Sequence, residues 1–276
     1  MPYWLLKLQL ILTQPVTYIV FIFGSVIGSF LNVCIVRLPQ GTFLKHARSM
    51  CPHCNQPIPS YANVPIVSWL LLRGKARCCG KGISVQYFLV ELATALLFVA
   101  IYWQYPFWDA QRLMIDPADF LRFAHVAVFL SALLVCGVID FHHKIIPDVI
   151  TLPMILLTPI VAYLHPELTW TSALFGALIG GGSLFAVAWL YYFVRKRPGL
   201  GMGDVKLLAV IGGWLGVEAI LPTILVASIS GAFFGCLFLI LKKGASLKSA
   251  IPFGPFLILG AAIHILFGPS VLQWLL

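Results

Sequence analysis

Two aspartates at the ends of apolar segments could together hydrolyse a peptide bond. Asp140 ends the run FLRFAHVAVFLSALLVCGVID, and Asp204 follows Gly201 and Gly203 in GMGDVK. An ionisable group near lipid is costly, about 2.5–3.5 kcal/mol at a helix centre, so its presence indicates a function. Two carboxylates in a partly dry site do not both ionise easily, and such a pair can activate water and donate a proton. The two glycines would let a substrate strand approach the backbone closely.

Simpler roles are also open for the acids near these positions. Asp148 and Asp204 both lie where a helix N-cap residue is expected. Capping does not explain Asp140, because an acid at a helix C-terminus opposes the macrodipole. We expect Asp148 either to cap a helix or to support the pair. Lys206 either neutralises the pair or anchors the helix end at lipid headgroups.

Four of the seven cysteines share one basic loop and have the spacing of metal ligands. They are Cys51, Cys54, Cys78 and Cys79. A reducing compartment disfavours disulfides there, and two thiol pairs indicate tetrahedral Zn(II) in a structural role. Because Cys78 and Cys79 are adjacent, three outcomes remain open: four thiolates, three thiolates with His53 or His46, or no metal.

The elements that must position these residues are membrane helices. The 276 residues are 61% hydrophobic and 10% charged, with a mean hydropathy of +0.97, whereas soluble domains are about 25% charged. Such low charge also argues against a nucleic-acid partner. Apolar runs predict about eight spans. They cover 16–36, 83–104, 120–140, 149–165, 171–194, 205–221, 222–241 and 254–275. The boundary at Pro222 is the weakest, because proline marks either a turn or a kink.

Positive charge orients the predicted bundle. With loop 37–82 in the cytosol, all of the 18 basic residues except Lys7, Arg112 and Arg122 lie inside, as the positive-inside rule requires. Joining the spans around Pro222 would move Lys242 and Lys243 outside, which favours eight helices. An even number of spans separates the two aspartates, so both are expected at the cytosolic face. No strong leader-cleavage site is evident, so we expect the first span to be retained.

The sequence therefore predicts an all-α polytopic membrane bundle of about eight transmembrane helices. A cysteine-containing cytosolic loop follows the first helix. The expected divisions are a first transmembrane helix (1–36), the loop with a zinc knuckle (37–82) and a seven-helix core (83–276).

Five segments resemble the prepilin peptidases, the bifunctional leader peptidase and N-methyltransferase enzymes of type IV pilus and type II secretion systems. They are GSFLNVCIVRLP (28–39), the CPHC…CCG loop (51–80), VIDFHHKIIPD (138–148), GMGDVK (201–206) and IPFGPFLILGA (251–261). They occur in the family's order. The cysteine loop departs from the family, many of whose members carry CxxC twice, whereas here Ala76 replaces the expected outer cysteine.

The resemblance implies an intramembrane aspartyl protease of the bacterial inner membrane, with Asp140 and Asp204 as the catalytic pair. It would cut the basic leader from prepilins or pseudopilins at the cytosolic face, while the apolar N-terminal helix of the substrate lies in the lipid bilayer. It would then methylate the new N-terminus with S-adenosylmethionine. Oligomeric state is left open.

Glu91, roughly two turns into the span 83–104, has several possible roles. It could pair with a basic residue of the loop, or hold the methyl donor or the substrate's ammonium group. The alternative is a buried acid satisfied by a neighbouring helix. For the whole protein, the rival hypothesis is an ion-coupled secondary transporter. That hypothesis predicts acids near mid-bilayer and an inverted repeat, and the sequence shows neither.

Overall fold

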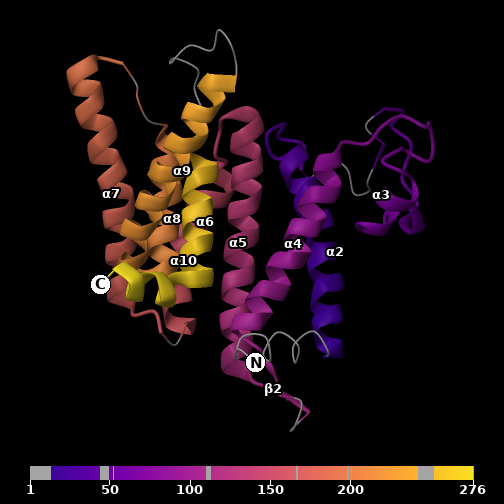
Figure 1. Cartoon of the computed structure of the whole chain (residues 1–276), viewed down its shortest axis with the longest axis horizontal. Coiled ribbons are helices and arrows are strands. Elements are labelled where there is room, and N and C mark those ends of the chain that lie inside the picture. Colours follow the sequence, from indigo (N-terminus) through magenta and orange to yellow (C-terminus); the bar gives the residue numbers. More distant parts are fainter. Residues whose placement is uncertain are drawn as a thin grey trace. The chain divides into compact units, whose positions relative to one another are not determined.

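The computed structural model describes residues 14–43, 50–51, 53–109, 113–165, 167–197, 199, 201–241 and 252–275. The chain forms two compact units, Met1–Ser131 and Ala132–Leu276. The described regular structure is helical except for one hairpin of two-residue strands (Figure 1). This confirms the predicted all-α class.

The first unit contains the elements that precede the middle of α5. They are α2 (Pro15–Arg37), η1 (Ser60–Ala62), α3 (Val67–Leu71), α4 (Val85–Gln104), β1 (Trp108–Asp109) and β2 (Met114–Ile115). Helix α5 (Pro117–His143) begins in this unit and ends in the second. The second unit continues with α6 (Asp148–Leu164), α7 (Trp170–Arg195), α8 (Met202–Leu215), η2 (Val217–Ala219), α9 (Ile220–Leu241) and α10 (Gly254–Leu275).

Each predicted apolar span corresponds to one described helix, except that the sixth, 205–221, also covers η2 and the first two residues of α9. Among the described residues, five helices are long and apolar enough to cross a bilayer, which makes this a multi-pass membrane protein. Helices α6 and α8, with 17 and 14 residues, are short for a full crossing. The count of eight crossings is therefore not confirmed. Seven of the basic residues used for orientation lie outside the described residues: Lys7, Lys45, Arg48, Arg112, Lys242, Lys243 and Lys248.

The predicted boundary between the sixth and seventh spans was wrong. Helix α8 ends at Leu215, and Gly216 has φ +88°, a left-handed conformation that a residue with a side chain rarely adopts. After η2, helix α9 begins at Ile220. Pro222 thus lies in the first turn of α9, where a missing N–H removes no helical hydrogen bond. The proline therefore does not end α8.

Helix α8 is the buried element of the second unit and packs against α6, α7 and α10. Leu207, Leu208 and Val210 are fully buried. The α7–α8 interface is close because Gly176 faces Gly212, where a Cβ on either would collide with the other's backbone. Figure 1 shows the helices of this unit running side by side. Any residue at the start of α8 is therefore held by its neighbours.

Helices α2 and α4 form the main packing contact of the first unit. A Cβ on Gly28 of α2 would lie 2.7 Å from the Cα of Glu91 on α4, so only glycine permits this approach. The loop between the two helices carries the four cysteines and α3.

Candidate active site and cysteine cluster

The end of α5 holds Asp140 in a tight, mostly buried position. Its side chain is 6% exposed, and its Oδ2 accepts a hydrogen bond of 3.1 Å from the backbone N–H of Gly254. Gly254 is the first residue of α10, where N–H groups lack helical partners. A Cβ on Gly254 would lie 2.6 Å from the same oxygen. Glycine is therefore the residue that lets α10 come this close to the carboxylate.

Asp204 lies in the first turn of α8 and is 9% exposed. The N-cap of this helix is Gly201, so the expectation that Asp204 is itself the N-cap was wrong. It is the third helical residue, and its carboxylate interacts with the backbone N–H of Gly201. The third helical position is the one from which an acidic side chain can reach back to the N-cap in a capping box, so Asp204 is placed to stabilise the start of α8.

Ile146, in the connection between α5 and α6, lies against a glycine beside each aspartate. These are Gly203, next to Asp204, and Gly254, which bonds to Asp140. A Cβ on Gly203 would lie 3.0 Å from the Cβ of Ile146, and one on Gly254 would lie 3.3 Å from its Cδ1. The two carboxylates interact electrostatically. Asp140 and Asp204 thus come from different helices to the same end of the second unit.

Asp148 and Lys206 form an ion pair next to this region. The Lys206 Nζ donates to Asp148 Oδ1 at 2.7 Å, and it joins the start of α6 to α8. Asp148 is the first residue of α6 and follows the N-cap residue Pro147, so it is not the N-cap. Its side chain is 56% exposed, compared with 29% for Lys206. Lys206 is two residues after Asp204 on α8, so the ion pair helps to fix the part of α8 that carries Asp204.

Two neighbouring carboxylates with limited access to water can divide the roles of base and acid. One remains charged and accepts a proton from water, while the other keeps its proton and donates it. This arrangement is suited to hydrolysis.

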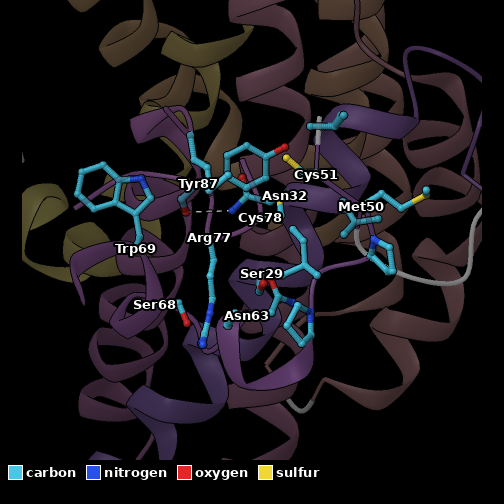
Figure 2. Close-up of a pocket in the computed structure, with 18 of the residues that line it drawn as sticks. Ser29, Asn32, Met50, Cys51, Asn63, Ser68, Trp69, Arg77, Cys78 and Tyr87 are labelled. Carbon is cyan, nitrogen blue, oxygen red and sulfur yellow. Dashed lines mark hydrogen bonds between the residues drawn. The ribbon is translucent and has the colours of Figure 1, made fainter. Parts of the chain in front are cut away.

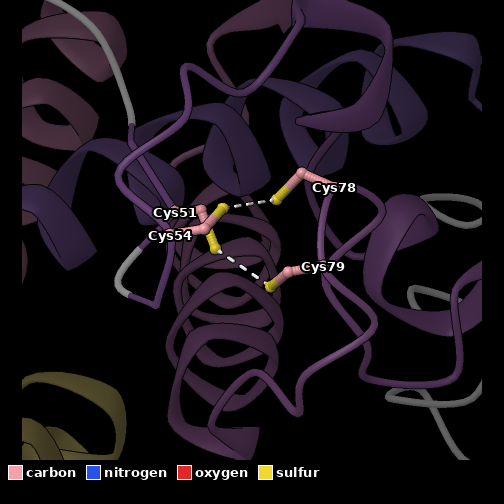
Figure 3. A group of neighbouring side chains, drawn as sticks. All are labelled: Cys51, Cys54, Cys78 and Cys79. Carbon is pink, nitrogen blue, oxygen red and sulfur yellow. Dashed lines mark hydrogen bonds between the residues drawn. The ribbon is translucent and has the colours of Figure 1, made fainter.

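The four loop cysteines form a compact cluster in the first unit (Figure 3). Their Sγ atoms all lie within 4.8 Å of one another. The Sγ distances are 3.8 Å between Cys51 and Cys79 and 3.3 Å between Cys54 and Cys78. Zn–S bonds of about 2.3 Å in a tetrahedron place the sulfurs about 3.8 Å apart. The cluster therefore fits a metal ion, and the adjacent cysteines both reach it.

Hydrogen bonds within the cluster make its thiols differ in how readily they lose a proton. A hydrogen bond from the backbone N–H of His53 lowers the pKa of Cys51 to about 6, whereas hydrogen bonding with Cys54 raises the pKa of Cys78 to about 12. Four thiolates this close repel one another unless a cation compensates them. The His53 ring bonds instead to the Gly82 carbonyl at 2.9 Å. The other possible histidine ligand, His46, lies outside the described residues.

Glu91 lies in the first unit, with the cysteine loop. It is 8% exposed, and its Oε2 accepts a 2.7 Å hydrogen bond from the backbone N–H of Ile66. Ser29 is a further partner. Glu91 thus interacts with a backbone amide and a hydroxyl group, whereas one expected role was pairing with an Arg or Lys of the loop. Glu91 also lines a cavity of about 440 Å³ between the loop and helices α2 and α4 (Figure 2).

Three residues in these sites were not predicted from the sequence: Gly254, Asn32 and Trp69. Gly254 lies in the segment 251–261, but nothing in that segment signals a contact with an aspartate more than a hundred positions earlier. Asn32 and Trp69, which line the cavity, read as ordinary apolar-helix and loop residues. Asn32 lies within the segment 28–39 that resembles the family, but neither that segment nor any periodicity indicates a cavity, because the cavity forms only when the loop folds onto α2.

Comparison with known families identifies both halves of the chain. Residues 22–105 match the bacterial peptidase A24 N-terminal domain, and residues 127–236 match the type IV leader peptidase family. The first match contains the cysteine cluster and Glu91, and the second contains Asp140 and Asp204.

Curated relatives agree over nearly the full length. The prepilin leader peptidase/N-methyltransferase of Stutzerimonas stutzeri is 33% identical, with 95% of each chain covered. A protein with the same name from Xanthomonas campestris pv. campestris is 36% identical, and the match covers 91% of each chain. The one from Aeromonas hydrophila is also 36% identical, and the match covers 94% of this chain and 93% of the relative. No solved structure shows a significant match. The chain belongs to the prepilin leader peptidase/N-methyltransferase family, which confirms the resemblance.

Proposed function

We propose that this protein is a bifunctional membrane enzyme that removes the basic leader of a prepilin or pseudopilin and then methylates the new N-terminus. The observation that carries the proposal is the pair of buried carboxylates that lie on either side of Ile146 in the family's peptidase region. The relatives' names supply both activities. The transporter alternative has no support among them.

Hydrolysis by this pair requires one charged and one protonated carboxylate. The charged carboxylate takes a proton from a water molecule while the water oxygen bonds to the scissile carbonyl carbon. The protonated partner donates to the carbonyl oxygen. As the tetrahedral intermediate collapses, the C–N bond breaks, and the carboxyl group that took the proton from water gives it to the departing amine. The Gly254 N–H holds the Asp140 carboxylate in position for these steps.

We place this site at the cytosolic face of the bacterial inner membrane. Support comes from the excess of Lys and Arg in the loops assigned to that face. Asp140 and Asp204 lie at helix ends, where a basic leader can stay in water while the following apolar helix of the substrate remains in lipid. We propose that a substrate strand approaches the backbone at Gly201, the N-cap of α8, whereas Gly203 packs against Ile146. The Lys206–Asp148 pair supports the helix that carries Asp204.

In the methyltransferase half, we assign a structural zinc ion to Cys51, Cys54, Cys78 and Cys79, because their geometry fits tetrahedral coordination. Zinc would hold the loop in its folded form. S-adenosylmethionine supplies the methyl group when bound. We assign Glu91 to the methylation step, because it is a buried carboxylate lining a cavity beside the cysteine loop. The divisions 1–36, 37–82 and 83–276 remain our proposed functional parts.

One assay tests both activities. Detergent-solubilised protein is incubated with a prepilin and S-adenosylmethionine carrying an isotopically labelled methyl group, and the product's N-terminus is read by mass spectrometry. We expect leader loss followed by one labelled methyl group on the new terminal amine. An uncut substrate would refute the peptidase assignment, and a cut but unlabelled product would refute the methyltransferase assignment.

A further inference from the structure

The cavity of the first unit has unsatisfied polar atoms in its wall. Asn32 is 1% exposed, and its Nδ2 donates to the Tyr87 carbonyl at 3.0 Å, which identifies the other amide atom as the oxygen. That Oδ1 and the Nε1 of Trp69 are both buried without a hydrogen-bond partner among the described residues. Leaving such groups unpaired is costly, so a ligand that pairs with them gains affinity. Figure 2 shows both side chains at the cavity.

The remaining wall is chemically varied. Glu91 supplies a carboxylate, and Arg37 and Arg77 supply positive charge. The Trp69 ring is held between Gly74, whose Cβ would lie 2.9 Å from it, and Phe88, whose ring centroid is 5.0 Å away. A ligand for this cavity should therefore combine a cation, an anion, a flat polar ring and both donors and acceptors.

S-adenosylmethionine has this combination. Its sulfonium and ammonium groups are cations for a carboxylate, its carboxylate suits an arginine, and its adenine offers N–H donors and ring-nitrogen acceptors. The volume of about 440 Å³ lies within the usual range of small-molecule sites. Of the small molecules that the proposed function requires, the methyl donor is the one that this wall fits.

We infer that this cavity is the methyl-donor site, with Asn32 and Trp69 as the residues that recognise it and Glu91 facing its cationic part. The inference rests on the proposed methyltransferase function and adds the place where the donor binds. Cys51 and Cys78 form part of the same wall, so the cysteine cluster shapes the site.

Binding of S-adenosylhomocysteine to the purified full-length protein tests the assignment without relying on turnover. Trp69→Phe keeps an aromatic ring but removes the indole N–H with part of the indole, and Asn32→Leu keeps the size but removes both the carbonyl and the N–H that bonds to Tyr87. We expect each to weaken binding about three- to tenfold, the effect of one hydrogen bond. Trp108→Phe, which removes an indole N–H in β1 outside the cavity, should bind like the unsubstituted protein.

Photo-crosslinking of labelled S-adenosylmethionine gives an independent location. We expect the label on peptides within 29–91. Unchanged affinity in both cavity variants, or a label within 132–276, would overturn the inference. If the variants bind normally while the protein still methylates prepilin, the inference fails alone. If the unsubstituted protein neither binds the probe nor methylates, the methyltransferase half of the proposed function fails with it.

Discussion

At the scale of single residues, the proposed peptidase site depends on how closely α10 approaches Asp140. The Gly254 N–H is 3.1 Å from Asp140 Oδ2, and a methyl group on Gly254 would meet that oxygen at 2.6 Å. The same methyl group would also contact Ile146 at 3.3 Å. The carboxylate therefore cannot stay in place if Gly254 gains a side chain.

Gly254→Ala is expected to lower leader cleavage by about 10²-fold, since a misplacement of about 1 Å at a catalytic group has that effect. Rates of prepilin cleavage by purified variants measure the loss. Gly182→Ala in α7 is the matched control, because a Cβ there has nothing within 4 Å. Equal cleavage by both alanine variants would show that the contact with Asp140 does not matter.

The sequence alone indicated Asp140 and Asp204 as candidate site residues, because acidic side chains are rare in apolar segments. It could not predict Gly254 as a partner, since a glycine carries no chemical signal and the contact joins helices distant in sequence. The cysteine cluster lies between these cases. The spacing indicated a metal site, but whether adjacent Cys78 and Cys79 could both reach it depended on loop geometry.

At the scale of elements, the start of α8 is positioned by its neighbours. The Lys206–Asp148 pair links α8 to α6, and Gly176 against Gly212 links it to α7. Hydropathy predicted the helices well because each apolar run is long. It misplaced the end of α8, because the stop signal is the single Gly216 and Pro222 was the more conspicuous breaker.

A double-mutant cycle on Asp148→Ala and Lys206→Ala tests the link between α6 and α8. Because the pair is partly exposed, we expect a coupling of about 0.2–1 kcal/mol in the free energy of unfolding. Cleavage should fall only a few-fold, and the double variant should be little worse than either single variant. Strictly additive losses would show that the two residues act separately.

At the scale of the whole molecule, we propose that the two activities divide between the two compact units. The cysteine cluster, Glu91 and the cavity lie in Met1–Ser131, and the aspartate pair lies in Ala132–Leu276. Family matches to 22–105 and 127–236 follow a similar division. Damage to one unit should therefore affect one activity more than the other.

Cys51→Ser is expected to reduce bound zinc, which we predict at about one ion per chain in the unsubstituted protein. Methylation should fall more than leader cleavage, because the cluster forms part of the cavity wall. Elemental analysis and both activity assays measure this. Cys236→Ser, an exposed thiol in α9, is the control and should keep its zinc. A zinc-free protein with both activities intact would remove the metal from the account.

The most direct test of the central claim is the rate of leader cleavage by Asp140→Asn and Asp204→Asn. An amide has nearly the same shape as the carboxylic acid but can neither take a proton from water nor return one. We predict that each variant remains in the membrane and cleaves prepilin at least about 10²–10⁴-fold more slowly, the usual contribution of an acid–base group. Cleavage at the unsubstituted rate by either variant would contradict the account.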